Sequence, residues 1–246
     1  TLASNEAARK SAASIFESAG TREGYCLVLG HGSQELIFEL AQQDGLRVVV
    51  VDPDQAAANS LRLALRAAGV GAAKVTVIAS DPAKVELPPY LASIAVVREM
   101  PPDDQPRAAL IAKVFAALRP FGGFASLPIR GQDGAKALAP LMASPDSAGI
   151  AWKPAGDTML LWRAGPLPGS GDWTHEHADA ANTRVSKDSL VKAPLGLLWF
   201  GGTSNEAILP RHGHGPQPQV CNGRLFIEGM DLIRAMDIYT GSVLWE

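Results

Sequence analysis

The chain has 246 residues, of which 47% are hydrophobic and 19% are charged, and its formal net charge is −3. This composition is that of a folded globular protein with one large domain or a domain and a smaller partner, and it excludes an intrinsically disordered chain. The small negative charge, with no run of basic residues, gives no reason to expect nucleic acid as a partner. No apolar run approaches the roughly 18 residues of a membrane span, so we expect none.

Two further features bear on the class of protein. Cys26 and Cys221 lie far apart, and Cys26 falls in an apolar run, so neither a disulfide framework nor a cysteine-ligated metal is expected. The chain lacks an initiator methionine and stops within a strand-like pattern at Trp245. We therefore expect it to be a fragment of a longer protein.

The first 165 residues alternate between helical and strand patterns. Apolar residues at helical spacing predict a first helix over 4–19. Strands are predicted at 25–29, 47–51, 74–78, 92–97 and 123–128, and further helices at 33–43, 54–68, 105–118 and 132–143. Two final strands, 149–153 and 158–163, flank a turn and predict a β-hairpin. The alternation predicts an α/β, Rossmann-like, doubly wound sheet with helices on both faces and a ligand at the carboxyl ends of its strands.

The clearest binding signal lies where the first apolar run stops at Gly30-His31-Gly32. Glycines at that place allow a tight turn and a close approach of the backbone to a ligand. The second apolar run ends on Asp52 about twenty residues later, at the spacing of an acid that accepts hydrogen bonds from a ribose diol. Asp52 could also cap the next helix, alone or together with ribose binding, because Pro53 suits a first helical turn. The pattern predicts a site for an adenosine-containing cofactor.

With these motifs and its terminal hairpin, the region 4–165 resembles the class I S-adenosylmethionine-dependent methyltransferases. The resemblance implies that residues 1–167 form a methyltransferase-like domain with S-adenosylmethionine as its small-molecule cofactor. It implies cofactor contacts from Gly30, His31, Gly32, Asp52, Pro53, Ser80, Asp81 and Val97. In this scheme the glycine turn backs the methionine part, Asp52 holds the ribose, and Ser80 and Asp81 meet the adenine amino group. Asp81 precedes a proline and could instead serve only to form a turn.

The resemblance implies no fixed catalytic residue. Methyl transfer from a sulfonium is an in-line displacement, for which holding donor and acceptor in line supplies most of the effect. A general base helps only if the acceptor must lose a proton, and the candidates are His31 and Glu99. The end of the fourth strand, with Val97, Arg98 and Glu99, is the expected substrate side.

Two alternatives to an active methyltransferase remain open. Gln34 replaces the third glycine of the family loop and Ser93 replaces an acid, which favours a degenerate fold kept as a non-catalytic binding or spacer module. A nicotinamide-dependent oxidoreductase would also use Asp52 for its ribose. Against it, Glu35 stands where that fingerprint has glycine, and the hairpin replaces a further parallel unit.

The pattern changes after Gly165, and we predict a linker over 168–194 followed by a small all-β segment over 195–246. Its strands are predicted at 195–200, 218–221, 224–228, 232–237 and 242–245, with Asn222-Gly223 as a hairpin turn. The stretch 235–245 reads Ala-x-Asp-x-x-Thr-Gly-x-x-x-Trp. It resembles the blade signature of the pyrroloquinoline-quinone-type (quinoprotein) β-propellers.

The blade resemblance implies structural roles: Asp237 accepts from turn amides and Trp245 docks between neighbouring blades. The signature does not ligate the quinone, so no pyrroloquinoline quinone is expected here. A propeller needs several blades, so the expected partners are the remaining blades of the parent chain. A propeller is typical of the periplasm or cell envelope, whereas the methyl donor is made in the cytoplasm, so the compartment stays open.

Four histidines invite a metal interpretation. His175 and His177, like His212 and His214, are separated by one residue, which places both imidazoles of a pair on one face of a strand. Zinc could use three such ligands. The surrounding glycines and prolines favour polar loops, and we predict no metal site.

Overall fold

The computed structural model describes residues 5–201, 203–209 and 215–246. The chain divides into two compact units between Ala164 and Gly165, which we call unit 1 and unit 2. The bridge between Trp173 and Val220 lies within unit 2, so part of the predicted linker pairs with the C-terminal sheet. The finer division into a linker over 168–194 and a blade over 195–246 remains a prediction.

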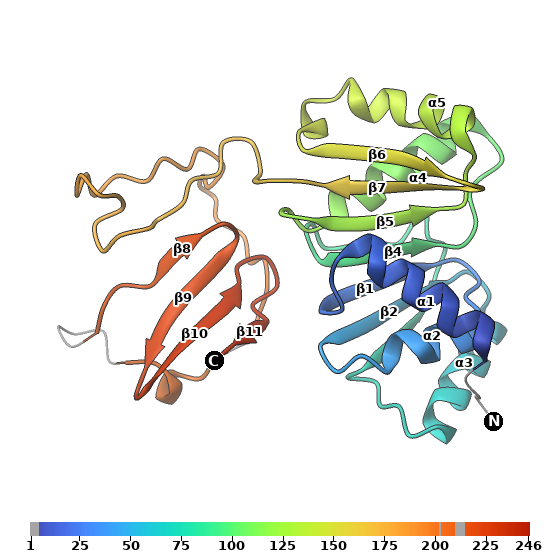
Figure 1. Ribbon diagram of the computed structural model, residues 1–246, viewed down its shortest axis with the longest axis horizontal. Coiled ribbons are helices and arrows are strands. Elements are labelled where there is room, and N and C mark those ends of the chain that lie inside the picture. Colours follow the sequence, from blue (N-terminus) through green and yellow to red (C-terminus); the bar gives the residue numbers. More distant parts are fainter. Residues whose placement is uncertain (1–4, 202, 210–214) are drawn as a thin grey trace. The chain divides into compact units, whose positions relative to one another are not determined.

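Unit 1 is built on a seven-stranded sheet in the order β3-β2-β1-β4-β5-β7-β6 (Figure 1). Its strands are β1 (Gly24–Leu29), β2 (Leu46–Asp52), β3 (Val75–Ala79), β4 (Ala92–Val97), β5 (Gly123–Leu127), β6 (Ile150–Ala155) and β7 (Thr158–Arg163). The first five strands pair in parallel, and β7 runs antiparallel to both β5 and β6. The predicted Rossmann-like sheet of the methyltransferase type, with its terminal hairpin, is confirmed.

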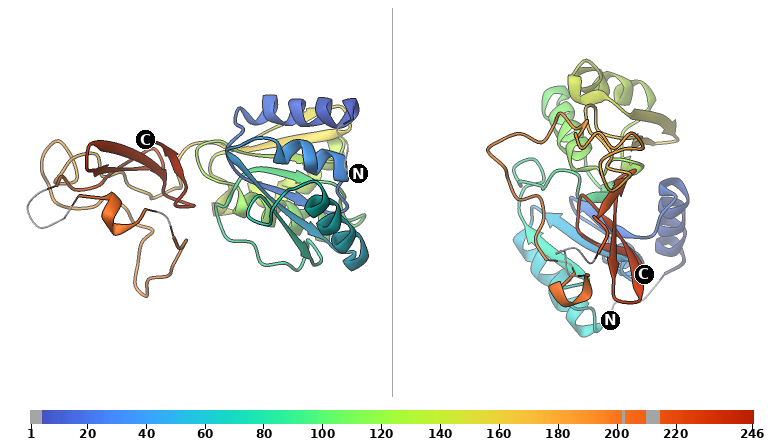
Figure 2. Two further views of the ribbon diagram at one scale, coloured as in Figure 1. Left: turned by 90° about the horizontal axis from the view of Figure 1, so that it is seen from below. Right: turned by 90° about the vertical axis from the view of Figure 1, so that its left-hand side faces the viewer.

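Helices cover both faces of this sheet (Figure 2). They are α1 (Glu6–Ala19), α2 (Gln34–Ala41), α3 (Gln55–Ala67), α4 (Asp104–Ala117) and α5 (Gly131–Met142). Cys26 and Val28 share one hydrophobic cluster with α1, α2 and α3, whereas Leu27 and Leu29 share the other with α4 and α5. Alternate residues of β1 therefore bury on opposite faces, as in a central strand. Burial raises the pKa of the Cys26 thiol to about 12, so this cysteine is a core residue and no nucleophile.

Local side chains fix where the helices begin and end. The Asn5 side chain caps α1 by accepting from the Ala8 N–H at 2.7 Å, and Gly20 ends that helix in the left-handed conformation with φ 67°. The chain then runs from β1 to β2 and β3 on one side, and β4 returns to the other side of β1. The carboxyl ends of β1 and β4 are thus the topological switch point, where open α/β sheets bind ligands.

Unit 2 contains a four-stranded antiparallel sheet in the order β11-β10-β9-β8. Its strands are β8 (Gln219–Cys221), β9 (Arg224–Gly229), β10 (Leu232–Asp237) and β11 (Val243–Trp245), and a short 3-10 helix, η2, spans Asn205–Ala207. Four of the five predicted strands are confirmed.

The predicted strand at 195–200 is wrong. This segment has no ladder partner in the described structure, and Leu197 and Phe200 are 79% and 94% exposed. Its anchor is Trp199, whose indole N–H donates to the Ile238 carbonyl at 2.8 Å. The apolar pattern of the segment resembles a strand, but a strand needs a neighbour to receive its backbone hydrogen bonds.

Candidate nucleoside-binding site

The glycine turn follows β1 at the switch point. Gly30 has φ +94°, a conformation that L side chains rarely adopt, so the backbone itself requires glycine here. Its N–H donates to the Val51 carbonyl at 2.9 Å, and the Arg98 N–H donates to the Leu29 carbonyl at 2.8 Å. These two bonds hold the turn against the ends of β2 and β4.

Asp52 lies at the carboxyl end of β2, and it is only 5% exposed. Its Oδ1 accepts from the Asp54 N–H at 2.8 Å and lies 3.1 Å from His31 Nδ1. The alternative role as helix cap is wrong, because Asp54 caps α3 by accepting from the N–H groups of Ala56 and Ala57. Both contacts of the Asp52 side chain in the described structure use Oδ1, which leaves Oδ2 for a ligand.

The residues after β3 divide into two roles. The Ser80 N–H donates to the Asp52 carbonyl at 2.9 Å, which brings Ser80 beside the predicted ribose acid. Asp81 forms a local turn: its Oδ1 accepts from the Ala83 N–H at 2.8 Å, and its Oδ2 lies 3.7 Å from Lys84 Nζ. These contacts support the turn-forming alternative for Asp81. Its contact with adenine stays a prediction.

At the end of β4, Val97 offers backbone atoms and no side chain to the candidate site. Val97 is 4% exposed, and its side chain packs in the cluster under α4, so a cofactor could meet only its backbone. Arg98 and Glu99 are exposed, and the nearest atoms to Gly30 on its side-chain face belong to these two residues, at 3.5–3.7 Å from an ideal Cβ. Pro53 is an exposed turn residue between Asp52 and the α3 cap.

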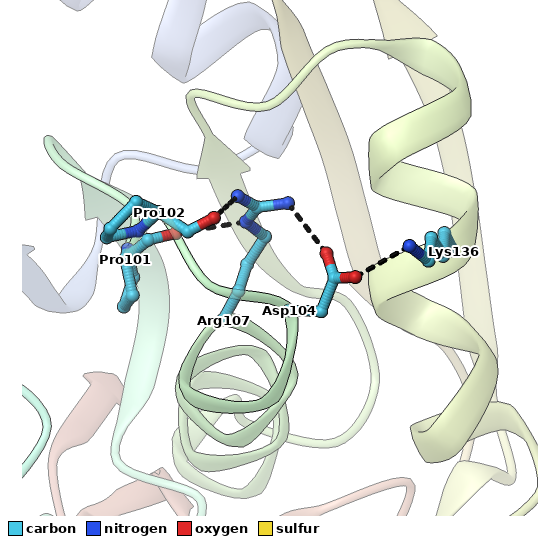
Figure 3. A network of polar contacts seen from close by, with 5 residues as sticks. All are labelled: Pro101, Pro102, Asp104, Arg107 and Lys136. Atoms are coloured by element: carbon cyan, nitrogen blue, oxygen red, sulfur yellow. Dashed lines mark hydrogen bonds and ion pairs between the residues drawn. The ribbon is translucent and has the colours of Figure 1, made fainter.

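A polar network braces the segment that follows β4 (Figure 3). The Arg107 guanidinium on α4 donates to the carbonyls of Pro101 (3.0 Å) and Pro102 and to Asp104 Oδ1 at 3.3 Å. Lys136 on α5 completes the network at 2.6 Å from Asp104 Oδ2. The expected substrate side is therefore tied to both helices of that face.

The sequence reasoning missed a fixed negative charge beside the glycine turn. Ser33 caps α2 by accepting from the Leu36 N–H at 3.3 Å, and its hydroxyl donates to Glu35 Oε2 at 2.6 Å. The Ser33 hydroxyl, and then the backbone N–H of Glu35 itself, lower the pKa of the Glu35 carboxyl. A serine two positions before an acid at a helix start was the available signal, but Glu35 was weighed only as a missing glycine.

Other sequence features lie away from this edge. Ser93 sits near the start of β4, beside Gly24 at the start of β1, so its departure from the family acid does not bear on the ligand edge. Two pockets in unit 1 also lie elsewhere: one lined by Phe16 and its neighbours up to Glu23, and one of about 410 Å³ between α4 and α5. Predicted cofactor residues line neither pocket.

The described part of the structure does not support a metal site at the histidine pairs. His175 Nδ1 lies 2.9 Å from the neighbouring Thr174 hydroxyl, and His212 and His214 fall outside the described residues. Within the described ranges, no cluster of three or more histidine, cysteine or acidic side chains could hold a metal ion. The same ranges contain no helix with the length and apolar character needed to span a membrane.

Comparison with known proteins finds similarity in structure alone. No family model and no curated protein matches the sequence. A putative S-adenosyl-L-methionine-dependent methyltransferase from Methanococcus maripaludis aligns with 64% of this chain and 84% of its own, at 12% identity and TM-score 0.48. A SAM-dependent O-methyltransferase from Thermotoga maritima aligns over 64% and 66%, at 17% identity and TM-score 0.46. Magnesium protoporphyrin IX methyltransferase from Synechocystis, solved with bound SAM, aligns over 63% and 79%, at 12% identity and TM-score 0.47.

Unit 1 has an α/β, Rossmann-like, seven-stranded mixed sheet, and the solved structures that align with this chain include S-adenosylmethionine-dependent methyltransferases.

Proposed function

We propose that unit 1 is an S-adenosylmethionine-dependent methyltransferase domain whose acceptor is unidentified. The observation that carries the proposal is the buried carboxylate of Asp52 at the end of β2, next to a glycine turn at the switch point. The carboxylate suits a ribose diol, which needs a pair of acceptors. The glycine turn suits it as well, because a ligand can approach the backbone closely there.

The residues present fit the nucleoside half of the cofactor. Asp52 would accept hydrogen bonds from the ribose hydroxyls, and Ser80, whose N–H donates to the Asp52 carbonyl, would lie on the adenine side. The cofactor, when bound, supplies a methyl group already activated by the sulfonium. The protein's part is to orient and to exclude water, with the Arg107-braced segment as the acceptor side.

Calorimetric titration with S-adenosylhomocysteine and, separately, with NAD tests this proposal. We expect S-adenosylhomocysteine to bind, and Asp52→Ala to weaken it by about 1.5–3 kcal/mol, the scale of a hydrogen bond to a charged group. Asp44→Ala is the matched control, because Asp44 is an exposed acid just before β2, at the amino end of the strand whose carboxyl end carries Asp52. Unchanged affinity in the Asp52 variant, or binding of NAD alone, would refute the proposal.

A second candidate is a non-catalytic nucleoside-binding module, and Glu35 favours it. This candidate places the carboxylate of the zwitterionic cofactor tail, and not its ammonium group, nearest Glu35, so that the ionised Glu35 side chain on the first turn of α2 would repel it. This candidate predicts that 5′-methylthioadenosine, which has no tail charge, binds more tightly than S-adenosylhomocysteine. Glu35→Gln should reduce that difference.

A second variant, Gln34→Gly, tests the side chain that stands in place of the third glycine. If this variant binds S-adenosylmethionine and the wild type does not, the result supports the non-catalytic module.

We also propose that the small sheet of unit 2 is a blade of a quinoprotein-type propeller. Asp237 supports this: it is 4% exposed, its Oδ1 accepts from the Tyr239 N–H at 2.8 Å, and its carbonyl accepts from the Gly241 N–H at 2.8 Å. Trp245 is 46% exposed at the edge strand, where a neighbouring blade would cover it.

Sedimentation velocity over a range of concentrations tests the blade proposal. A lone blade leaves an apolar face and a strand edge uncovered, so we expect concentration-dependent association. A monomer with an unfolded C-terminal segment would contradict the proposal.

A further inference from the structure

Two tryptophans of unit 2 end copies of one short pattern. Residues 197–199 read Leu-Leu-Trp, and residues 243–245 read Val-Leu-Trp, 46 positions later. A period of about 40–50 residues is that of one propeller blade, a unit that buries its apolar faces only against its neighbours. At the spacing of the signature 235–245, no Asp and no Thr-Gly pair precede Trp199, so the first copy repeats the outer strand alone.

Trp199 occupies the turn between β10 and β11. Its indole N–H donates to the Ile238 carbonyl at 2.8 Å. An ideal Cβ on Gly241 would lie 2.6 Å from the indole Cδ2, so the ring packs directly against the glycine α-carbon. Any side chain at this position would displace the ring. The turn 238–241 therefore has the shape of a receptor for tryptophan.

This receptor turn is held by its own hydrogen bonds. Asp237 Oδ1 accepts from the Tyr239 N–H at 2.8 Å, and the Asp237 carbonyl accepts from the Gly241 N–H at 2.8 Å. The Asp237 N–H donates to the Ser242 carbonyl at 2.9 Å. All three bonds lie within residues 237–242, so the turn is preformed for whichever tryptophan enters it.

Trp245 is the second tryptophan of the pattern, and it is 46% exposed. It stands on β11, opposite Ala235 of β10. We infer that Trp199 belongs to the outer strand of the preceding blade, and that Trp245 is presented in the same way to the receptor turn of the following blade. These roles rest on the proposed blade, and they add the surface through which blades dock, its occupant and the order of docking.

The segment 195–200 lacks the neighbour that a strand needs. It has no ladder partner in the described part of the chain, and Leu197 and Phe200 are 79% and 94% exposed. An outer strand exchanges its backbone hydrogen bonds with the strand inside it, as β11 does with β10. The partner of this segment is therefore the sheet edge of the preceding blade, to which it adds as a further strand.

The tethered Trp199 fills the receptor turn in this chain. A group linked to its own site competes at an effective concentration on the order of millimolar. Trp245 of a second copy therefore competes poorly for the turn while Trp199 is present. Removing Trp199 opens the turn, and a second copy then serves as the probe for the neighbouring blade.

Sedimentation velocity of mixed variants tests these roles. The acceptor is a fluorescently labelled chain with Trp199→Ala and Trp245→Ala, which has an open turn and no docking tryptophan, and the donor is the unaltered chain. We expect a complex of one acceptor with one donor, which neither protein forms alone at the same concentration. A donor with Trp245→Ala should bind at least about tenfold more weakly, the scale of a buried tryptophan anchor. A donor with Trp173→Ala, at the other tryptophan of unit 2, should bind as the unaltered chain does.

The outcomes separate the docking roles from the blade on which they rest. Equal binding of the Trp245→Ala donor, or no complex with the unaltered donor, overturns the inference. Hydrogen exchange at the amides of β9 and β10 checks that unit 2 of the acceptor is folded. If Trp199→Ala unfolds it, Trp199→Leu takes its place, because leucine keeps an apolar side chain in the segment but has no N–H to donate. Association of the unaltered chain that does not need Trp245 overturns the docking roles and leaves the blade standing, whereas an unfolded C-terminal segment in that chain overturns both.

Discussion

Arg163, the last residue of β7, ties the hairpin to the end of α4. It is 7% exposed, and its Nη1 donates to the carbonyls of Phe115 at 3.2 Å and Leu118 at 3.5 Å. Its guanidinium also lies over the rings of Phe115 and Tyr90, at 4.7 and 5.0 Å from their centroids. We predict that Arg163→Met, which keeps most of the apolar stem, destabilises unit 1.

The contacts set the size of the effect. The shorter hydrogen bond from a charged donor contributes about 1.5–3 kcal/mol, and each cation–π contact about 1 kcal/mol. The recovered desolvation cost of the buried guanidinium offsets part of this sum. A net loss of about 2–4 kcal/mol remains, which is a large share of the 5–15 kcal/mol that stabilises a typical domain.

Urea denaturation followed by the helical circular dichroism signal measures this loss. All five α-helices of the described chain lie in unit 1, so the signal reports on that unit. Arg47→Met is the control: Arg47 is exposed on β2 and contacts Tyr25 only at the surface, so we expect a change below about 0.5 kcal/mol. A change that small at Arg163 as well would refute the reasoning that these buried contacts contribute net stability.

Three further predictions concern a cap, a turn and an anchor. The capped N–H groups lower the pKa of Asp54, so its contribution to stability is present above the unfolded pKa of about 4 and is lost as the pH falls below it. Asp54→Asn should therefore show a shallower fall in urea midpoint between about pH 7 and about pH 3. Gly30→Ala should cost about 1–2 kcal/mol because of its positive φ, whereas Gly71→Ala, with open space around it, should cost little in the same assay. Trp199→Ala removes the bond to the Ile238 carbonyl and should speed proteolysis of unit 2 without changing the helical signal; unaltered proteolysis would contradict the anchoring role.

Most of the unit 1 fold could be predicted because its signals are local. Continuous apolar runs and helical spacing located the seven strands and five helices, and the hairpin turn separated β6 and β7 from another crossover. The strand at 195–200 could not be judged in this way. Its residues are apolar, but whether a neighbouring strand pairs with them is a property of the whole unit.

Two features of the candidate site could be located in the fold for the same reason. The glycine turn at Gly30 and the carboxylate of Asp52 lie at strand ends, which leave a local pattern in the sequence, whereas their contact with a cofactor stays a prediction. The alternative in which Asp52 caps the helix put the cap two residues early, because Asp52 and Asp54 are both acids beside Pro53 and only backbone geometry tells them apart. The hydrogen bond that fixes Glu35 depends on a rotamer that the sequence does not specify.

The sequence by itself determined the alternation of elements, the glycine at the turn and the carboxylate at the end of β2, because each depends on residues close together in the chain. Tertiary structure decided which side chains share that carboxylate. His31 and Asp52 are 21 positions apart, and they meet because β1 and β2 pair in parallel and end at the same edge of the sheet. The strand order brings β4 to the other side of β1 and so places Arg98 and Glu99 beside the same turn. Contacts of this kind arise from register and topology, which the packing of the whole sheet sets.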